Sequence, residues 1–218
     1  MSLAGGKPSN LSKEELTSSF NQYLNNGIHG ICFSSYEDGQ EPGTIITAEQ
    51  IEKRIKILQP YTKWVRTFSC TDGNELIPAI AHKHGLKVMV GAWLSDDKEL
   101  NEKEITNLIQ VAKAGNADLV AVGNEVLYRK ELTEEELLAY INRVKKELPD
   151  IEVGYVDAYY EFRDRPALSD ACDVIFANCY PFWEGCHIDY SLLYMKSMYD
   201  IAVTAAKGKK VVISETGW

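Results

Sequence analysis

The stretch VVISETGW, residues 211–218, predicts a short buried strand that ends in a carboxylate. Three β-branched apolar residues in a row are typical of a strand covered on both faces, and Glu215 follows them closely. The earlier stretch LVAVGNEVL, residues 119–127, has the same order, with an apolar run followed by Asn124 and Glu125. Because parallel strands of a barrel end at the same rim, we expect the two glutamates to lie close together there.

Two carboxyl groups at one rim suit the hydrolysis of a glycosidic bond. One acid protonates the leaving oxygen while the second carboxylate attacks or shields the anomeric carbon. A single strand-end glutamate often has a structural role instead, because it can cap the next helix or form a salt bridge with a loop. Two such residues on one barrel favour the catalytic interpretation.

The motifs VGNEVL and ISETGW resemble the acid/base and nucleophile motifs of glycoside hydrolase family 17, the β-1,3-glucanases. NCYPF, residues 178–182, resembles the sixth-strand motif of this family. The similarity runs from about Gly27 to Trp218. It implies a retaining enzyme that acts on β-1,3-glucan, with Glu125 as acid/base and Glu215 as nucleophile. The stretch at residues 30–36 only loosely resembles the plant members, which favours a bacterial or fungal-like subgroup.

Apolar runs alternate along the chain with amphipathic helical patterns. Seven strands are predicted, with starts at about residues 28, 63, 86, 118, 151, 172 and 209. Their mean spacing of roughly 30 residues is the length of one βα unit. The pattern predicts an α/β fold, a TIM (β/α)8-type barrel truncated after strand seven. Strands one and seven are then expected to be unpaired edges.

The predicted catalytic domain is a single unit, residues 11–218, that lacks its last βα repeat. Residues 1–10 are interpreted as an N-terminus that is disordered or was added for expression, because the chain begins Met-Ser-Leu. Between Ser12 and Gly27 an apolar residue recurs every fourth position after a capping box. We expect this amphipathic helix to plug the bottom of the barrel.

Charge and hydropathy limit the classes of partner. The net charge of −9 and the isoelectric point near 5.0 argue against nucleic acid and anionic membranes, and they are compatible with a neutral polysaccharide. No run of 18 apolar residues predicts a membrane-spanning segment, and no signal peptide is recognisable. The implied substrate favours a secreted, periplasmic or cell-envelope location. Oligomeric state is not predicted.

The cysteines and histidines predict neither a metal site nor a cofactor. The five cysteines are an odd number without CxxC spacing, so we favour buried thiols and leave a Cys179–Cys186 bridge open. The four histidines are scattered without ligand spacing.

Three polar residues are expected beside the glutamates. Asn124 matches the position at which related barrels hold the sugar 2-hydroxyl. Tyr180 is expected to orient Glu215 or to touch the sugar. Arg66, at the end of strand two, can hydrogen-bond the nucleophile and keep it ionised, or it can form a structural ion pair.

Aromatic residues crowd the same predicted rim. Flat rings stack on the C–H faces of sugars, which makes four of these residues candidates for substrate binding: Tyr36, Trp93, Phe182 and Trp218. Each ring alone is more often a loop anchor than part of a sugar site.

Three functions remain open at this stage. The first is a retaining β-1,3-glucanase. The second is a β-1,3-glucanosyltransferase on the same site, in which a sugar hydroxyl replaces water. The third is a glucan-binding protein without turnover, against which both intact glutamates argue.

Overall fold

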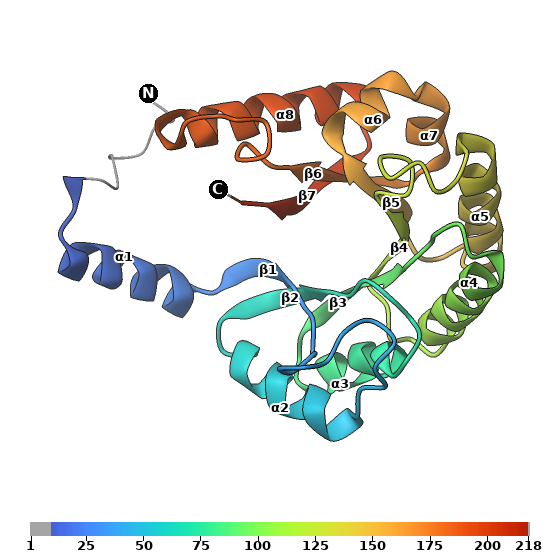
Figure 1. The fold of residues 1–218 in the computed structure, drawn as a ribbon, viewed down its shortest axis with the longest axis horizontal. Coiled ribbons are helices and arrows are strands. Elements are labelled where there is room, and N and C mark those ends of the chain that lie inside the picture. Colours follow the sequence, from blue (N-terminus) through green and yellow to red (C-terminus); the bar gives the residue numbers. More distant parts are fainter. Residues whose placement is uncertain (1–9, 218) are drawn as a thin grey trace.

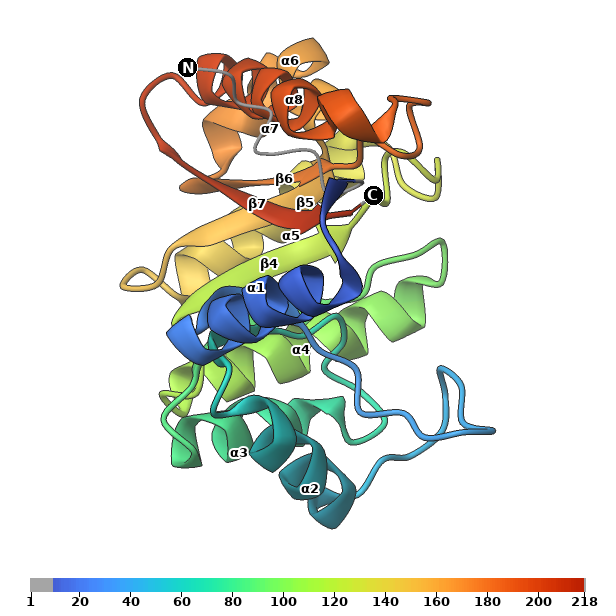
Figure 2. The same cartoon turned by 90° about the vertical axis from the view of Figure 1, so that its left-hand side faces the viewer.

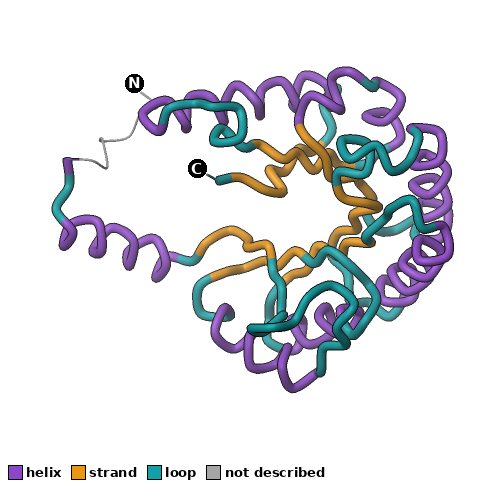
Figure 3. Tube along the Cα trace, in the orientation of Figure 1, coloured by secondary structure: helices purple, strands orange, loops and turns teal. Residues whose placement is uncertain are grey.

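Seven parallel strands form one sheet in the order β1 to β7, and each pairs with the next strand along the chain. The structure, a computed structural model, describes residues 10–217. Helices surround the strands on the outside (Figures 1 and 3). This is the predicted TIM-type barrel, with seven strands among the described residues. The predicted N-terminal segment lies outside the described residues except for Asn10, and so does Trp218.

The strands that lie in the middle of the sheet are almost wholly buried. Strand bounds are β1 Ile28–Cys32, β2 Thr62–Arg66, β3 Lys87–Ala92, β4 Leu119–Asn124, β5 Val153–Ala158, β6 Val174–Cys179 and β7 Lys210–Thr216. Every residue of β4 and β6 is buried, as expected for parallel strands covered on both faces. The edge strands β1 and β7 are more exposed.

Four of the helices begin after a residue whose side chain caps the first turn. Their bounds are α1 Lys13–Asn26, α2 Ala48–Leu58, α3 Ile77–Lys83, α4 Lys98–Lys113, α5 Glu134–Glu147, α6 Tyr159–Asp164, α7 Pro166–Ala171 and α8 Ser191–Ala205, with 3₁₀ turns at Asn74–Leu76 and Ile188–Tyr190. Before α5, Thr133 and Glu136 form a complete capping box. The same helix buries Leu137, Ile141 and Val144, which recur at helical spacing.

Two apolar layers lie on opposite faces of the sheet. The larger one fills the space between strands and helices. The smaller one packs alternate strand residues, such as Met89, Val156 and Phe176, inside the barrel. Trp64 packs against this inner layer. The strands are thus fixed from both sides, which holds their carboxyl ends in place.

The helix α1 does not plug the barrel, contrary to expectation. None of its residues is buried, and Phe20 and Tyr23 are largely exposed. It lies beside β1 at the open side of the barrel, across from β7 (Figure 1). Near the carboxyl ends of these two edge strands, the Cys32 thiol donates to the carbonyl of Ser214 at 3.3 Å. The two edges therefore approach each other at the rim.

The loops that follow the strands project from one end of the barrel, and the long loop from β1 to α2 shows this most clearly (Figure 2). The carboxyl ends of all seven strands point to this rim, because the strands are parallel. Both predicted catalytic glutamates lie there, at or just after the ends of β4 and β7.

Candidate active site

Glu125 is the first residue after β4 and lies in a turn with unusual backbone geometry. Its φ is +51°, in the left-handed region that non-glycine residues rarely adopt. Its backbone N–H donates to the carbonyl of Val156 on β5 (2.8 Å). Its Oε1 accepts a hydrogen bond from Asn178 Nδ2 (2.7 Å) at the end of β6. Glu125 is therefore fixed by the next two strands, β5 and β6.

Glu215 near the end of β7 is held by two donors. Arg66, from the end of β2, forms an ion pair with Oε1, and the Tyr180 hydroxyl donates to Oε2 at 2.7 Å. The side chains of Arg66 and Glu215 are only 7% and 16% exposed, so water screens this pair weakly. Both carboxylate oxygens are thus occupied, and the carboxylate has one defined orientation.

Two bridges join the glutamates into one network. Arg66 donates to Glu215 and also to Asn124 Oδ1, the side chain next to Glu125. On the other side, Asn178 donates to Glu125 and accepts from Ser214 Oγ (2.7 Å), the neighbour of Glu215. Strands β2, β4, β6 and β7 therefore contribute to a single hydrogen-bonded site.

The Tyr180 hydroxyl stays protonated in this position. Burial, together with the hydrogen bond to Glu215 and its charge, raises the pKa of Tyr180 above its ordinary range. The hydroxyl is consequently a stable donor to Glu215. The predicted role of Tyr180 in orienting Glu215 thus has a geometric basis.

The predicted aromatic residues lie in different surroundings. Trp93 is half-buried, and the Arg129 guanidinium covers one face of its ring at 4.5 Å. Tyr36 packs against the outer apolar layer. Phe182 is half exposed and packs edge-to-face on Trp183, with ring centres 5.1 Å apart. Of the predicted residues, Arg66, Asn124, Glu125, Tyr180 and Glu215 form the network.

Sequence reasoning missed three residues that the structure places in or beside the network: Asn178, Ser214 and Arg129. Two of them had a usable signal. Asn178 and Ser214 lie near strand ends, at the same rim as the glutamates. The contacts of Arg129 with Asn124 and Leu94 depend on how the turn after β4 folds, which the sequence pattern does not specify.

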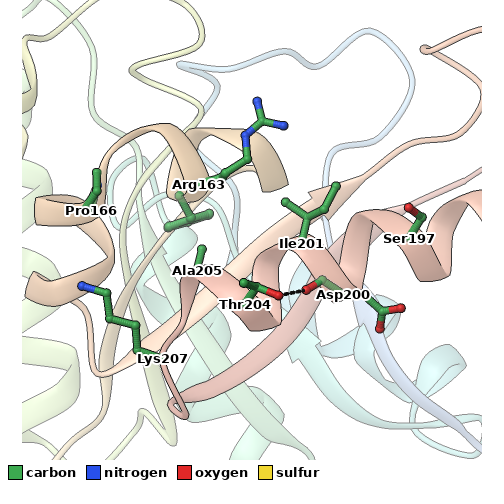
Figure 4. A pocket seen from close by; sticks show the side chains of 9 residues that line it. Arg163, Pro166, Ser197, Asp200, Ile201, Thr204, Ala205 and Lys207 are labelled. Atoms are coloured by element: carbon green, nitrogen blue, oxygen red, sulfur yellow. Dashed lines mark hydrogen bonds between the residues drawn. The ribbon is translucent and has the colours of Figure 1, made fainter.

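A separate cavity of about 440 Å³ lies on the outside of the barrel, between α6, α7 and α8 (Figure 4). Its lining includes Phe162 and Ile201, with the charged groups of Arg163 and Lys207 beside them. None of the predicted site residues lines it. It belongs to the helical layer, away from the strand-end network.

The cysteines form no bridge at the Cys179–Cys186 loop. Cys179 is buried, and the Cys186 thiol donates to the carbonyl of His187 (3.4 Å). Cys70 and Cys172 are also buried, whereas Cys32 is exposed at the rim. Among residues 10–217, no group of three or more histidine, cysteine or acidic side chains could hold a metal ion. In the same range, no helix has the length and apolar character needed to cross a membrane.

The family model described as the BtgE/BtgC glycoside hydrolase domain matches residues 30–218, which include nearly all of the barrel. The chain belongs to this family. The BtgE/BtgC domain match, together with the structural relative below, places it in glycoside hydrolase family 17, as the strand-end motifs indicated.

Individual BtgE/BtgC relatives agree with this assignment. A glucan 1,3-beta-glucosidase of Arthroderma benhamiae is 32% identical over 186 residues, covering 77% of this chain and 58% of the relative. The glucan 1,3-beta-glucosidase BGL2 of Candida albicans is 27% identical over 202 residues, covering 82% of this chain and 65% of the relative. This chain thus spans less than two thirds of the length of either enzyme.

A solved structure shows the same barrel. The glycoside hydrolase family 17 beta-1,3-glucanosyltransferase from Rhizomucor miehei superposes with a TM-score of 0.77 at 31% identity. The match covers 89% of this chain and 73% of that enzyme. An active-site mutant of the same enzyme was solved in complex with laminaritriose.

Proposed function

We propose that this protein cleaves β-1,3-linked glucan with retention of configuration, with Glu125 as acid/base and Glu215 as nucleophile. Membership of the family supports a glycosidase, and the names of the relatives support β-1,3-glucan as the substrate. The observation that carries the proposal is the hydrogen-bonded network. It joins two strand-end glutamates through Arg66 on one side and Asn178 on the other.

In the first step, Glu215 attacks the anomeric carbon. Its ion pair with Arg66 and its hydrogen bond from Tyr180 hold it as an oriented carboxylate. The bond from the anomeric carbon to the leaving oxygen breaks as Glu125 transfers its proton to that oxygen. The products are a shortened glucan and a glycosyl-enzyme ester on Glu215.

In the second step, Glu125 acts as a base. It takes a proton from water, and the water oxygen attacks the same carbon from the face that the leaving group vacated. The ester bond to Glu215 breaks, which regenerates the carboxylate that pairs with Arg66. Two inversions give net retention. We expect Asn124, whose Oδ1 accepts a hydrogen bond from Arg66, to bind the sugar 2-hydroxyl beside the reacting carbon.

Transfer to a second sugar is the alternative outcome of the second step. The structural relative from Rhizomucor miehei is a glucanosyltransferase. Exposed rings near the rim, Phe182 and Trp183, offer stacking surfaces for an acceptor sugar. In that reaction a glucan hydroxyl takes the place of water, and Glu125 deprotonates it in the same way.

The test is turnover of β-1,3-linked gluco-oligosaccharides, with β-1,4-linked oligosaccharides of equal length beside them. Products from the β-1,3 series alone are expected. Glu215→Gln should abolish turnover, and Glu125→Gln should lower kcat by about 10²- to 10⁴-fold, the usual contribution of a general acid/base. Products longer than the substrate would identify the transferase.

The matched control is Glu147→Gln, which changes an exposed glutamate paired with Lys113 away from the network. Its turnover should equal that of the unmodified chain. Equal activity of all three glutamine variants would contradict the proposal. Binding of β-1,3-glucan without turnover by the unmodified chain would leave a glucan-binding protein.

A further inference from the structure

The turn that carries Glu125 has a costly backbone conformation. Pairing between β4 and β5 shifts register between Ala121 and Asn124, and Gly123 has a φ of +90°. Glu125 follows at +51°, and Lys130 at the end of the turn has a φ of +60°. Each left-handed non-glycine residue costs about 1–2 kcal/mol, so neighbouring groups must hold this shape.

Arg129 holds the turn from the side of β3. Its guanidinium donates to the carbonyl of Asn124, the residue directly before Glu125. It also donates to the carbonyl of Leu94 after β3 (2.9 Å) and forms an ion pair with Glu131 (2.6 Å). The backbone N–H of Arg129 donates to the carbonyl of Glu125 (2.8 Å). One residue therefore bonds to the peptide groups on both sides of Glu125.

Tyr155 and Asp157 hold the turn from the side of β5. The Tyr155 hydroxyl accepts the backbone N–H of Leu127 (3.0 Å) and donates to Asp157. Asp157 also accepts the backbone N–H of Tyr128 (3.4 Å). Tyr155 and Asp157 are fully buried. Both lie on a central strand, so they form a rigid support beneath the turn.

We propose that Arg129 and the Tyr155–Asp157 pair are positioning residues that fix the reach of Glu125 toward the leaving oxygen. This inference rests on the proposed role of Glu125. Neither group needs to touch the sugar. They act by restricting the backbone on each side of Glu125, because proton transfer requires a heavy-atom separation of about 2.6–3.2 Å. A displacement of about 1 Å is sufficient to cost roughly 100-fold in rate.

Two aryl glycosides of laminaribiose distinguish a misplaced Glu125 acid from a general loss of folded protein. Phenol is a poor leaving group that needs a proton from Glu125, whereas 2,4-dinitrophenolate leaves without one. Arg129→Met and Tyr155→Phe should lower kcat/KM for the phenyl glycoside about 10- to 100-fold. Both variants should leave the dinitrophenyl value within about threefold.

Two further variants complete the kinetic test. Arg129→Lys should retain more activity than Arg129→Met but less than the unmodified chain. The single ammonium nitrogen of lysine cannot replace the two guanidinium nitrogens that donate to the two carbonyls. Arg143→Met, which removes an exposed arginine paired with Glu102, should change neither substrate. Equal losses for both aryl glycosides in Arg129→Met, or no loss, would overturn the proposal.

Crystal structures of the unliganded variants give an answer that does not depend on activity. In Arg129→Met the φ of Glu125 should leave the left-handed region, or its carboxyl should move by about 1 Å relative to Glu215. An unchanged turn would overturn the positioning role even if the chain is active. An unmodified chain that cleaves neither aryl glycoside would instead refute the proposed function, and the crystal structures would still decide this inference.

Discussion

Arg66 is one of the two residues that connect the halves of the site. Its guanidinium is almost fully buried and donates to both Glu215 and Asn124. A buried charge whose partner is removed costs about 3–5 kcal/mol, much more than an exposed pair contributes. We therefore expect this contact to affect both catalysis and folding.

Arg66→Met should lower the free energy of unfolding by about 3 kcal/mol, because it leaves the Glu215 carboxylate without its cation. The double variant Arg66→Met/Glu215→Gln should recover a large part of that loss. Urea unfolding of the two single variants and the double variant gives the coupling free energy. A coupling near zero would show that the ion pair does not stabilise the fold.

At the residue scale, sequence position predicted part of the site. Glu125 and Glu215 could be found because each closely follows an apolar run, and parallel strands end at one rim. Arg66 and Tyr180 were found from strand-end position and from the family motif. Arg129 was missed, since its contacts depend on a left-handed turn that no local pattern specifies. Trp218 stays a prediction, because it lies outside the described residues.

At the element scale, strand β5 supports the site through a buried acid. Burial is the main cause that raises the pKa of Asp157 to about 7, and its hydrogen bonds from Tyr155 and the backbone partly oppose this shift. The folded protein then holds this proton more tightly than the unfolded chain, in which an aspartate has a pKa near 3.9. The carboxyl of Asp157 is therefore a source of pH-dependent stability.

The free energy of unfolding should fall as the pH rises from about 4 to about 7. In this window Asp157 holds its proton in the folded protein but has lost it in the unfolded chain. A shift of about three pK units corresponds to about 4 kcal/mol. Asp157→Asn should remove this contribution. Urea unfolding of both proteins at pH 4.5 and pH 8 isolates it, since the other groups are shared. An identical pH dependence would contradict the raised pKa.

Helix starts were predicted well where a capping threonine is present. The patterns TAEQ and TEEE predict helix starts at Thr47 and Thr133, which cap α2 and α5. For α4 the pattern NEKE predicts a cap at Asn101, but the structure has the cap at Asp97 and Asn101 inside the helix. The short helix α6 was not expected, because Ala158 before it offers no side-chain cap.

At the scale of the whole molecule, the repeat of βα units predicted the barrel and its strand order. The position of α1 was predicted wrongly. Its apolar residues recur at helical spacing, but this pattern does not identify the surface that they contact, and the helix lies beside β1 with no buried residue. On the open side of the barrel, the Cys32 thiol on β1 donates to the carbonyl of Ser214 on β7, next to Glu215.

Glu125 and Glu215 are proposed to perform a retaining double displacement. Proton NMR of the first products from β-1,3-linked gluco-oligosaccharides tests it directly, with Glu215→Gln run in parallel. The β-anomer should appear first, the α-anomer should grow only by mutarotation, and Glu215→Gln should give no product. An α-anomer as first product, or a β-anomer formed equally fast by Glu215→Gln, would contradict it.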